Sequence, residues 1–153
     1  MRNMRRSRSQ RGAMLVEFAL SMTLLLLTVF AMLEAMLMIY TYNVMADAAK
    51  EGVRYASVRG SYSALAIGPA GKPGAAPETC YTDSGPIDTH VRKFASLSLH
   101  DTTGMSVKVC YLDGSNTPPS RVQVNIRYPL VPYFALPWTP PRVVAQAQGH
   151  IVH

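Results

Sequence analysis

The chain has 153 residues, 48% of them hydrophobic, and a formal charge of +6 from 15 basic and nine acidic residues. Five of the basic residues lie among the first eleven, so the rest of the chain has ten basic and nine acidic residues and is close to neutral. This distribution argues against a nucleic-acid-binding surface, which needs basic residues on the folded domain, and the length allows one modest domain.

A basic leader, residues 1–12, precedes a stretch that is apolar almost without break from Phe18 to Ala46. The leader has no acidic residue, and its cations are Arg2, Arg5, Arg6, Arg8 and Arg11. Basic residues flanking a membrane span are retained in the cytoplasm. We therefore expect a cytoplasmic N-terminus, a single-pass anchor in the inner membrane, and export of the C-terminal part to the periplasm.

The length of the membrane span depends on the treatment of two acidic residues. Glu17 and Glu34 enclose sixteen uncharged residues, 18–33, which as a helix cover about 24 Å and are short for a bilayer. A span of about residues 18–40 places Tyr40 and Tyr42 at the outer interface, where tyrosine is enriched. Glu34 then lies within the membrane, either protonated or facing a partner. The alternative is a secretory signal cleaved after Ala46 or Ala48.

The same helix is expected to continue beyond the membrane, so that it covers residues 13–59 with a periplasmic extension to about 58. Apolar or small residues recur there at three- and four-residue steps, which predicts one buried face; they are Tyr42, Met45, Ala46, Ala49, Gly52, Val53 and Ala56. The alternative is two helices with a break near Asn43. Asparagine costs only a fraction of a kcal/mol within a helix, so its presence does not decide between the two.

Glycine and proline recur in residues 60–86, which predicts a linker, and residues 87–153 are expected to form a small head packed on the N-terminal helix. Pro86 suits the first turn of a short amphipathic helix that ends near His100. Alternation of apolar residues then predicts strands at 107–111 and 122–128, and a third strand is expected at 143–152. The predicted fold class is α+β, a long transmembrane helix with a small head of one short helix and about three antiparallel strands. We assign no role to the proline-rich stretch 129–141.

Cys80 and Cys110 are the only cysteines, and both follow the predicted span. Paired thiols in an oxidising compartment predict a disulfide, here between the linker and a strand. Neither cysteine has a second cysteine or a histidine at metal-ligand spacing, and there is no phosphate-binding loop or nucleophile motif. The histidines are scattered, at His90, His100, His150 and His153. We therefore expect no metal, no cofactor, no catalytic residues and no enzymatic activity.

Three segments carry a family resemblance: RGAMLVEFAL at the leader boundary, NVMADAAKEGVRYASV in the helix extension, and VQVNIRYPLVPYF in the head. The first resembles the processing site of type IV prepilin-like proteins, and together they resemble the TadE-like family of the tight-adherence, or Flp-type, pilus system. The resemblance implies a minor pseudopilin of the inner membrane with a pilin-like head, needed for pilus assembly and cut by a prepilin peptidase between Gly12 and Ala13. Its other partners would be pilins, pseudopilins and the inner-membrane assembly platform. Under this resemblance, Glu34 corresponds to an acidic residue that members of the family often have late in the membrane span.

Glu17 has a physical role that does not depend on the family. A carboxylate just inside an apolar boundary is costly when unpaired, and cleavage after Gly12 would create a compensating ammonium group on Ala13. Pairing within one chain or with a neighbour would set the register of packed helices. The alternative for Glu17 is a hydrated glutamate without a partner. The alternative for the whole protein is an unprocessed membrane-anchored periplasmic binding module.

Overall fold

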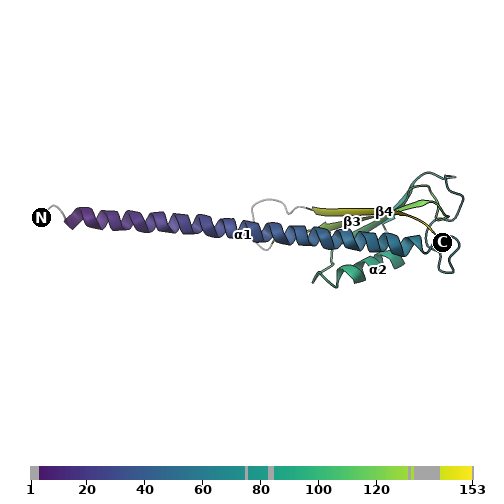
Figure 1. Cartoon of the computed structure of the whole chain (residues 1–153), viewed down its shortest axis with the longest axis horizontal. Coiled ribbons are helices and arrows are strands. Elements are labelled where there is room, and N and C mark those ends of the chain that lie inside the picture. The colour runs from purple at the N-terminus through teal and green to yellow at the C-terminus, as the bar shows by residue number, and fades with distance from the viewer. Residues whose placement is uncertain (1–3, 75, 83–84, 131, 133–141, 153) are drawn as a thin grey trace.

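The computed structural model describes residues 4–152 except 75, 83–84, 131 and 133–141, with side chains from residue 12 onward. A single helix, α1 (Met4–Ser57), runs from the leader into the head without interruption at Asn43 (Figure 1). It begins at Met4, inside the predicted leader, which contains no proline and is rich in arginine, a good helix former. The predicted long N-terminal helix is confirmed.

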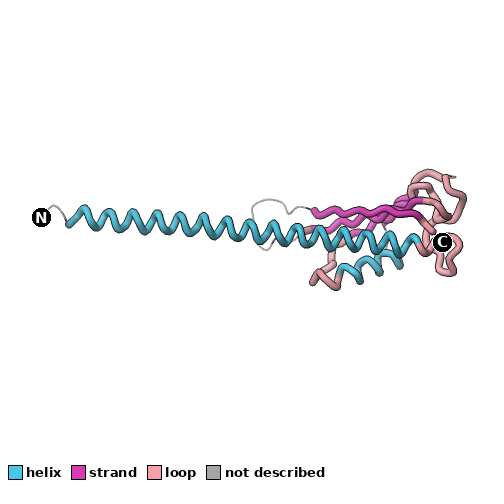
Figure 2. The backbone as a smooth tube through the Cα atoms, in the orientation of Figure 1, coloured by secondary structure: helices cyan, strands magenta, loops and turns pink. Residues whose placement is uncertain are grey.

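The head contains a second helix, α2 (Pro86–Ala95), and a sheet of four antiparallel strands (Figure 2). The strands are β1 (Thr79–Thr82), β2 (Ser106–Tyr111), β3 (Arg121–Pro129) and β4 (Arg142–His150), in the order β1-β2-β3-β4. The α+β class is therefore confirmed, with four strands where about three were predicted. The extra strand, β1, is only four residues long and lies in the predicted linker, too short for alternation to reveal it.

The core lies between the helices and one face of the sheet. Alternate residues of β3, namely Val122, Val124 and Ile126, are fully buried, as expected for a sheet with one covered face. The outer half of α1 packs against β3, β4 and α2. The C-terminal residue of β2, Tyr111, is also buried, and its hydroxyl donates to the carbonyl oxygen of Ile67 at 3.0 Å.

Much of the predicted linker packs on the head. The backbone N–H of Ser61 donates to the carbonyl oxygen of Asn116 at 3.1 Å, and the Asn116 side-chain amide donates to the carbonyl oxygen of Ile67. Gly68 has a φ of +107°, and a Cβ there would lie 2.3 Å from the Tyr111 ring, so only glycine fits. Close approach to the sheet therefore explains Gly68, whereas a Cβ at Gly71 or Gly74 would meet no described atom within 4 Å.

Candidate functional site

The predicted processing junction lies on the exposed, membrane-side end of α1. Gly12, Ala13 and Glu17 are all helical and exposed. Residues four apart share a helix face, so Ala13 and Glu17 are neighbours one turn apart, about 6 Å along the axis. An ammonium group at Ala13 would therefore lie within reach of the Glu17 carboxylate of its own chain. Gly12 lies on a different side of the helix from Glu17.

The two glycines of α1 differ in their surroundings. A Cβ at Gly52 would lie 2.7 Å from Val91 Cγ2 and 3.3 Å from Val124 Cγ1, so the close approach of α1, α2 and β3 requires glycine. A Cβ at Gly12 would meet no atom of the described side chains, which begin at residue 12, within 4 Å. Glycine in a helix costs about 1 kcal/mol relative to alanine. Packing within the chain therefore explains Gly52 and gives no reason for Gly12.

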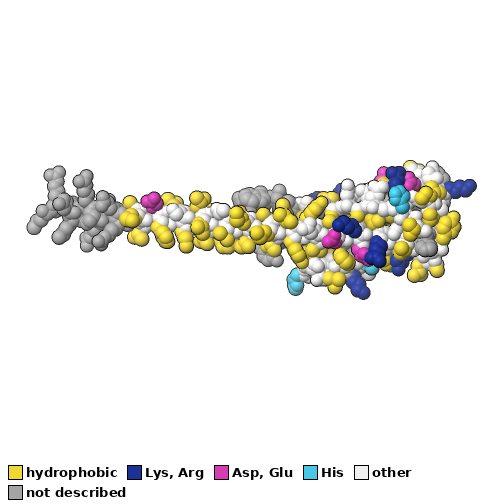
Figure 3. Space-filling model, viewed as in Figure 1, with side chains coloured by type: hydrophobic (Ala, Val, Ile, Leu, Met, Phe, Trp, Pro, Cys, Tyr) yellow, Lys and Arg dark blue, Asp and Glu magenta, His cyan; other side chains and the backbone are white. Residues whose placement is uncertain are grey.

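The surface of α1 between the leader and the head is apolar (Figure 3). By length and composition the segment Gly12–Ser57 could cross a membrane, and none of its most apolar window is buried in the head. Exposed side chains here include Leu24, Leu25, Leu27, Met32, Met36 and Ile39. Burial of each large apolar side chain is worth about 1.5 to 3 kcal/mol, so a surface of this extent indicates an apolar surrounding. α1 is thus a candidate membrane anchor.

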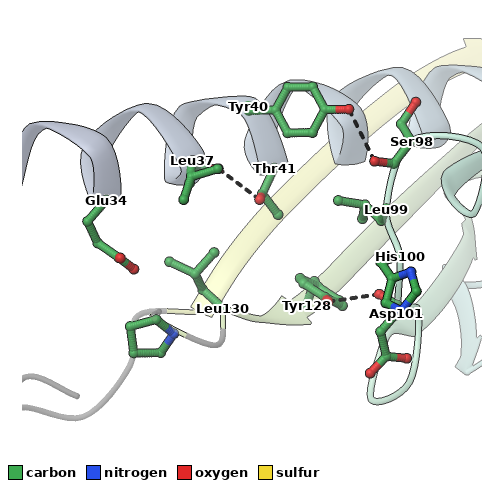
Figure 4. Close-up of a pocket in the computed structure, with 11 residues that line it drawn as sticks. Glu34, Leu37, Tyr40, Thr41, Ser98, Leu99, His100, Asp101, Tyr128 and Leu130 are labelled. Carbon is green, nitrogen blue, oxygen red and sulfur yellow. Dashed lines mark hydrogen bonds between the residues drawn. The ribbon is translucent and has the colours of Figure 1, made fainter. Parts of the chain in front are cut away.

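Glu34 lies where the head first reaches α1. Its side chain is directed into a cavity of about 460 Å³, and Leu130 lies beside it (Figure 4). Glu34 Oε2 is inaccessible to solvent and has no hydrogen-bond partner among the described residues. Other lining residues are Leu37, Tyr40, Thr41, Leu99, His100 and Tyr128. The carboxyl group therefore faces the head, and this cavity is where a proton or a partner would have to satisfy it.

Three contacts hold the loop that follows α2, residues 96–105, in place; we name it the proximal loop. The Tyr40 hydroxyl donates to the carbonyl oxygen of Ser98 at 3.1 Å, and the Tyr128 hydroxyl donates to that of Asp101 at 2.8 Å (Figure 4). Arg92 donates to the carbonyl oxygens of Thr102 and Met105 while it pairs with Asp88. The loop is thereby fixed to α1, β3 and α2.

Asp101, at the mouth of the cavity, is held in its charged form. The side chain and the backbone N–H of Thr103 form hydrogen bonds with the carboxylate and place its pKa below the ordinary value of 3.8. A second carboxylate, that of Asp113, forms hydrogen bonds with the side chain and backbone N–H of Arg121, which lower its pKa to about 2. The Asp113–Arg121 pair lies on the turn between β2 and β3, far along the chain from Glu34.

A stacked pair of rings joins α1 to α2, with a carboxylate bonded to one ring and a guanidinium group over the other. The His90 ring lies 4.3 Å from the Tyr55 ring and its Nε2 is 3.2 Å from Glu51 Oε1, while Arg59 covers the Tyr55 ring at 3.6 Å. Glu51 and Tyr55 are one helical turn apart, which the sequence could have indicated. His90 comes from α2, 39 residues away from Glu51, and sequence reasoning treated it as one of several scattered histidines. The Glu-Gly-Val-Arg-Tyr segment therefore attaches α2 to α1.

The predicted disulfide is present: Cys80 and Cys110 are bonded and lie opposite each other in β1 and β2. Glu78 lies near both, close enough for three ligand atoms to surround an ion. Because the two sulfur atoms are bonded to each other, they are not available as thiolate ligands. The bond joins strand to strand rather than loop to strand. Most of the proline-rich stretch 129–141 lies outside the described residues.

Residues 12–54 match the model of the TadE-like protein family. The match lies entirely within α1, includes Gly12, Glu17 and Glu34, and ends at Arg54, so of the Glu-Gly-Val-Arg-Tyr segment only Tyr55 lies outside it. It confirms the resemblance found in the sequence over this helix, whereas the sheet, α2 and the disulfide lie outside it. No curated protein and no solved structure matches the chain.

Proposed function

We propose that this protein is a minor pseudopilin of a tight-adherence (Flp-type) pilus system, anchored in the inner membrane by α1 and required for pilus assembly. The observation that carries the proposal is the match of residues 12–54 to the TadE-like family. The exposed apolar helix is consistent with an anchor, and the five arginines of the leader favour a cytoplasmic N-terminus. The head would then lie in the periplasm, where its disulfide can form.

A dedicated prepilin peptidase is the proposed processing enzyme, with cleavage between Gly12 and Ala13. Support comes from the contrast between the two glycines of α1, because Gly12 weakens the helix at a place where no packing contact requires it. A peptidase must bind the backbone in an extended form, and the helix unwinds most readily at such a residue. The ammonium group released on Ala13 would pair with Glu17 of the same or a neighbouring chain.

The first experiment is to measure the mass and N-terminal sequence of the full chain extracted from its own membranes. We expect a chain that begins at Ala13, and an uncut chain for Gly12→Ala in the same cells. Gly12→Ala is a suitable variant because the added methyl group meets no atom within 4 Å and leaves the fold unchanged. A wild-type chain that keeps its leader would instead favour the unprocessed binding module, and one that begins at Asp47 or Ala49 would favour a secreted head.

Pilus assembly is tested separately from cleavage. Glu17→Gln removes the charge and keeps the shape, and we expect it to be cleaved normally but to assemble few or no pili, scored by electron microscopy of the cells. Glu34→Gln is the matched control within the same helix, because Glu34 faces the head rather than a neighbouring helix. Normal piliation in Glu17→Gln would exclude the pairing role of Glu17.

A further inference from the structure

The end of α2 that faces the membrane displays apolar side chains to solvent. Leu97, two residues beyond the helix, is 79% exposed, and Phe94 in its last turn is 37% exposed. Leu97 adjoins Ser98, whose carbonyl oxygen accepts the Tyr40 hydroxyl. It therefore lies near the level of Tyr40, the residue at which the apolar surface of α1 ends.

This exposure belongs to a fixed segment. Within the proximal loop, the backbone N–H groups of Leu97, Ser98 and Leu99 donate to carbonyl oxygens of Phe94 and Ala95. Tyr40 and Arg92 then tie the same loop to α1 and α2. Leu97 is therefore exposed on a turn that hydrogen bonds fix to α1 and α2, so its position relative to the membrane follows directly from that of α1.

The surroundings of Leu97 have the character of a bilayer interface. On α1, Tyr40, which contacts the loop, and the preceding Ile39 are both exposed, and the polar Asn43 follows about one turn further toward the head. Tyrosine prefers the headgroup region. Lys93, in the last turn of α2, and His100, within the loop, give this segment a cationic and a polar side chain, as in segments that lie on a membrane.

We infer that residues 94–100 dock on the outer leaflet of the membrane, with the Leu97 side chain inserted at the boundary between headgroups and acyl chains and the polar side chains of the loop among the headgroups. The partner is a lipid surface, because the exposed Leu97 lies near the level of Tyr40, where the exposed apolar part of α1 reaches the head. This inference rests on the proposed membrane anchor. Its consequence is a second contact with the bilayer, besides α1, that fixes the tilt and rotation of the head.

Tryptophan fluorescence in lipid vesicles tests the inference on the full chain. Leu97→Trp is made in a Trp138→Phe background, because Trp138 is the one native tryptophan, and the protein is reconstituted into phosphatidylethanolamine–phosphatidylglycerol vesicles with or without acyl-brominated phosphatidylcholine. The matched control is Leu65→Trp, at a residue that is 69% exposed near the far end of α1, roughly 28 Å further along the helix axis. Leu25→Trp, at an exposed residue within the proposed span, reports on the anchor itself.

We expect strong quenching by brominated lipid for Leu25→Trp, blue-shifted emission with clear quenching for Leu97→Trp, and no quenching for Leu65→Trp. Quenching of the Leu25→Trp variant alone would overturn the inference and leave the anchor intact, whereas no quenching in any variant would overturn the anchor. A blue shift for Leu97→Trp without quenching would indicate a protein partner and would also overturn the inference. The same substitutions with Trp138 retained, read as the added quenching, guard against misfolding of the Trp138→Phe background.

Discussion

Gly52→Ala is the substitution that most directly tests how the head attaches to α1. Gly52 is buried where α1, α2 and β3 meet, and an added Cβ would lie 2.7 Å from Val91 Cγ2. The new methyl group gains about 1 kcal/mol of helix propensity. Overpacking of a filled core costs about 1 to 3 kcal/mol, and Val91 is β-branched and cannot rotate away easily. We therefore expect a net loss of up to about 2 kcal/mol in the free energy of unfolding.

The loss is measured by urea unfolding of the full chain in detergent micelles. Near-UV circular dichroism is the appropriate signal, because Tyr55, Tyr111 and Tyr128 pack in the head, while the part of α1 inside the micelle remains helical and would dominate a far-UV signal.

A double-mutant cycle identifies the clash itself. Val91→Ala alone is expected to destabilise the head by leaving a cavity, and in Gly52→Ala/Val91→Ala the added methyl group occupies part of that space. We expect the double variant to be more stable than the sum of the two single effects by about 0.5 to 3 kcal/mol. A Gly52→Ala variant more stable than wild type, or strict additivity in the cycle, would refute the packing argument.

Three further outcomes are expected. Cys80→Ala/Cys110→Ala should lower the free energy of unfolding by about 3 to 4 kcal/mol, since the bond closes a loop of about thirty residues. Reduction of the disulfide in the wild-type chain should produce a similar loss. An unchanged urea midpoint would contradict this expectation. The pKa of Asp113 is about 2 in the folded head and 3.8 ordinarily. Its pairing with Arg121 therefore stabilises the fold above about pH 4, and this contribution disappears as the pH falls toward 2. Melting temperatures of Asp113→Asn should depend less on pH between 2 and 4 than those of the wild type. Arg92→Lys keeps the charge but cannot bridge both loop carbonyl groups, and urea unfolding should reveal a loss of about 1 to 3 kcal/mol.

The helices and three of the strands were predictable because each has a periodic pattern long enough to read. Alternation at Val122, Val124 and Ile126 matches the buried face of β3 in the structure. β1 was not predicted because its four residues, Thr-Cys-Tyr-Thr, hold only two periods of the strand repeat. Antiparallel pairing with β2, rather than a local pattern, makes them a strand. Composition predicted a loop over residues 60–86, but it could not show that this loop packs on the head, where Gly68 is required by the closeness of the Tyr111 ring.

The candidate site was predictable where it depends on one segment of the chain. Glu17 and Glu34 were singled out from their places at the edge of and within the apolar stretch, and Gly12 and Ala13 from the resemblance to prepilin processing sites. The direction of Glu34 could not be predicted, because the cavity that it enters is completed by Leu130 and the proximal loop, which are remote in sequence. The stack of His90 on Tyr55 is likewise a product of the packing of α2 on α1.

The continuity of α1 has a mechanical consequence. It contains no proline, and of its two glycines Gly52 is locked in the core and Gly12 stands near the free end. No flexible joint therefore separates the anchor from the head along a rod of roughly 80 Å. A force or torque applied to the N-terminal end of α1 is transmitted along the helix to its C-terminal end, where it acts as shear between α1 and the sheet. The head and the N-terminal part of α1 therefore move together, and any displacement of that part along the helix axis carries the head with it in a fixed orientation.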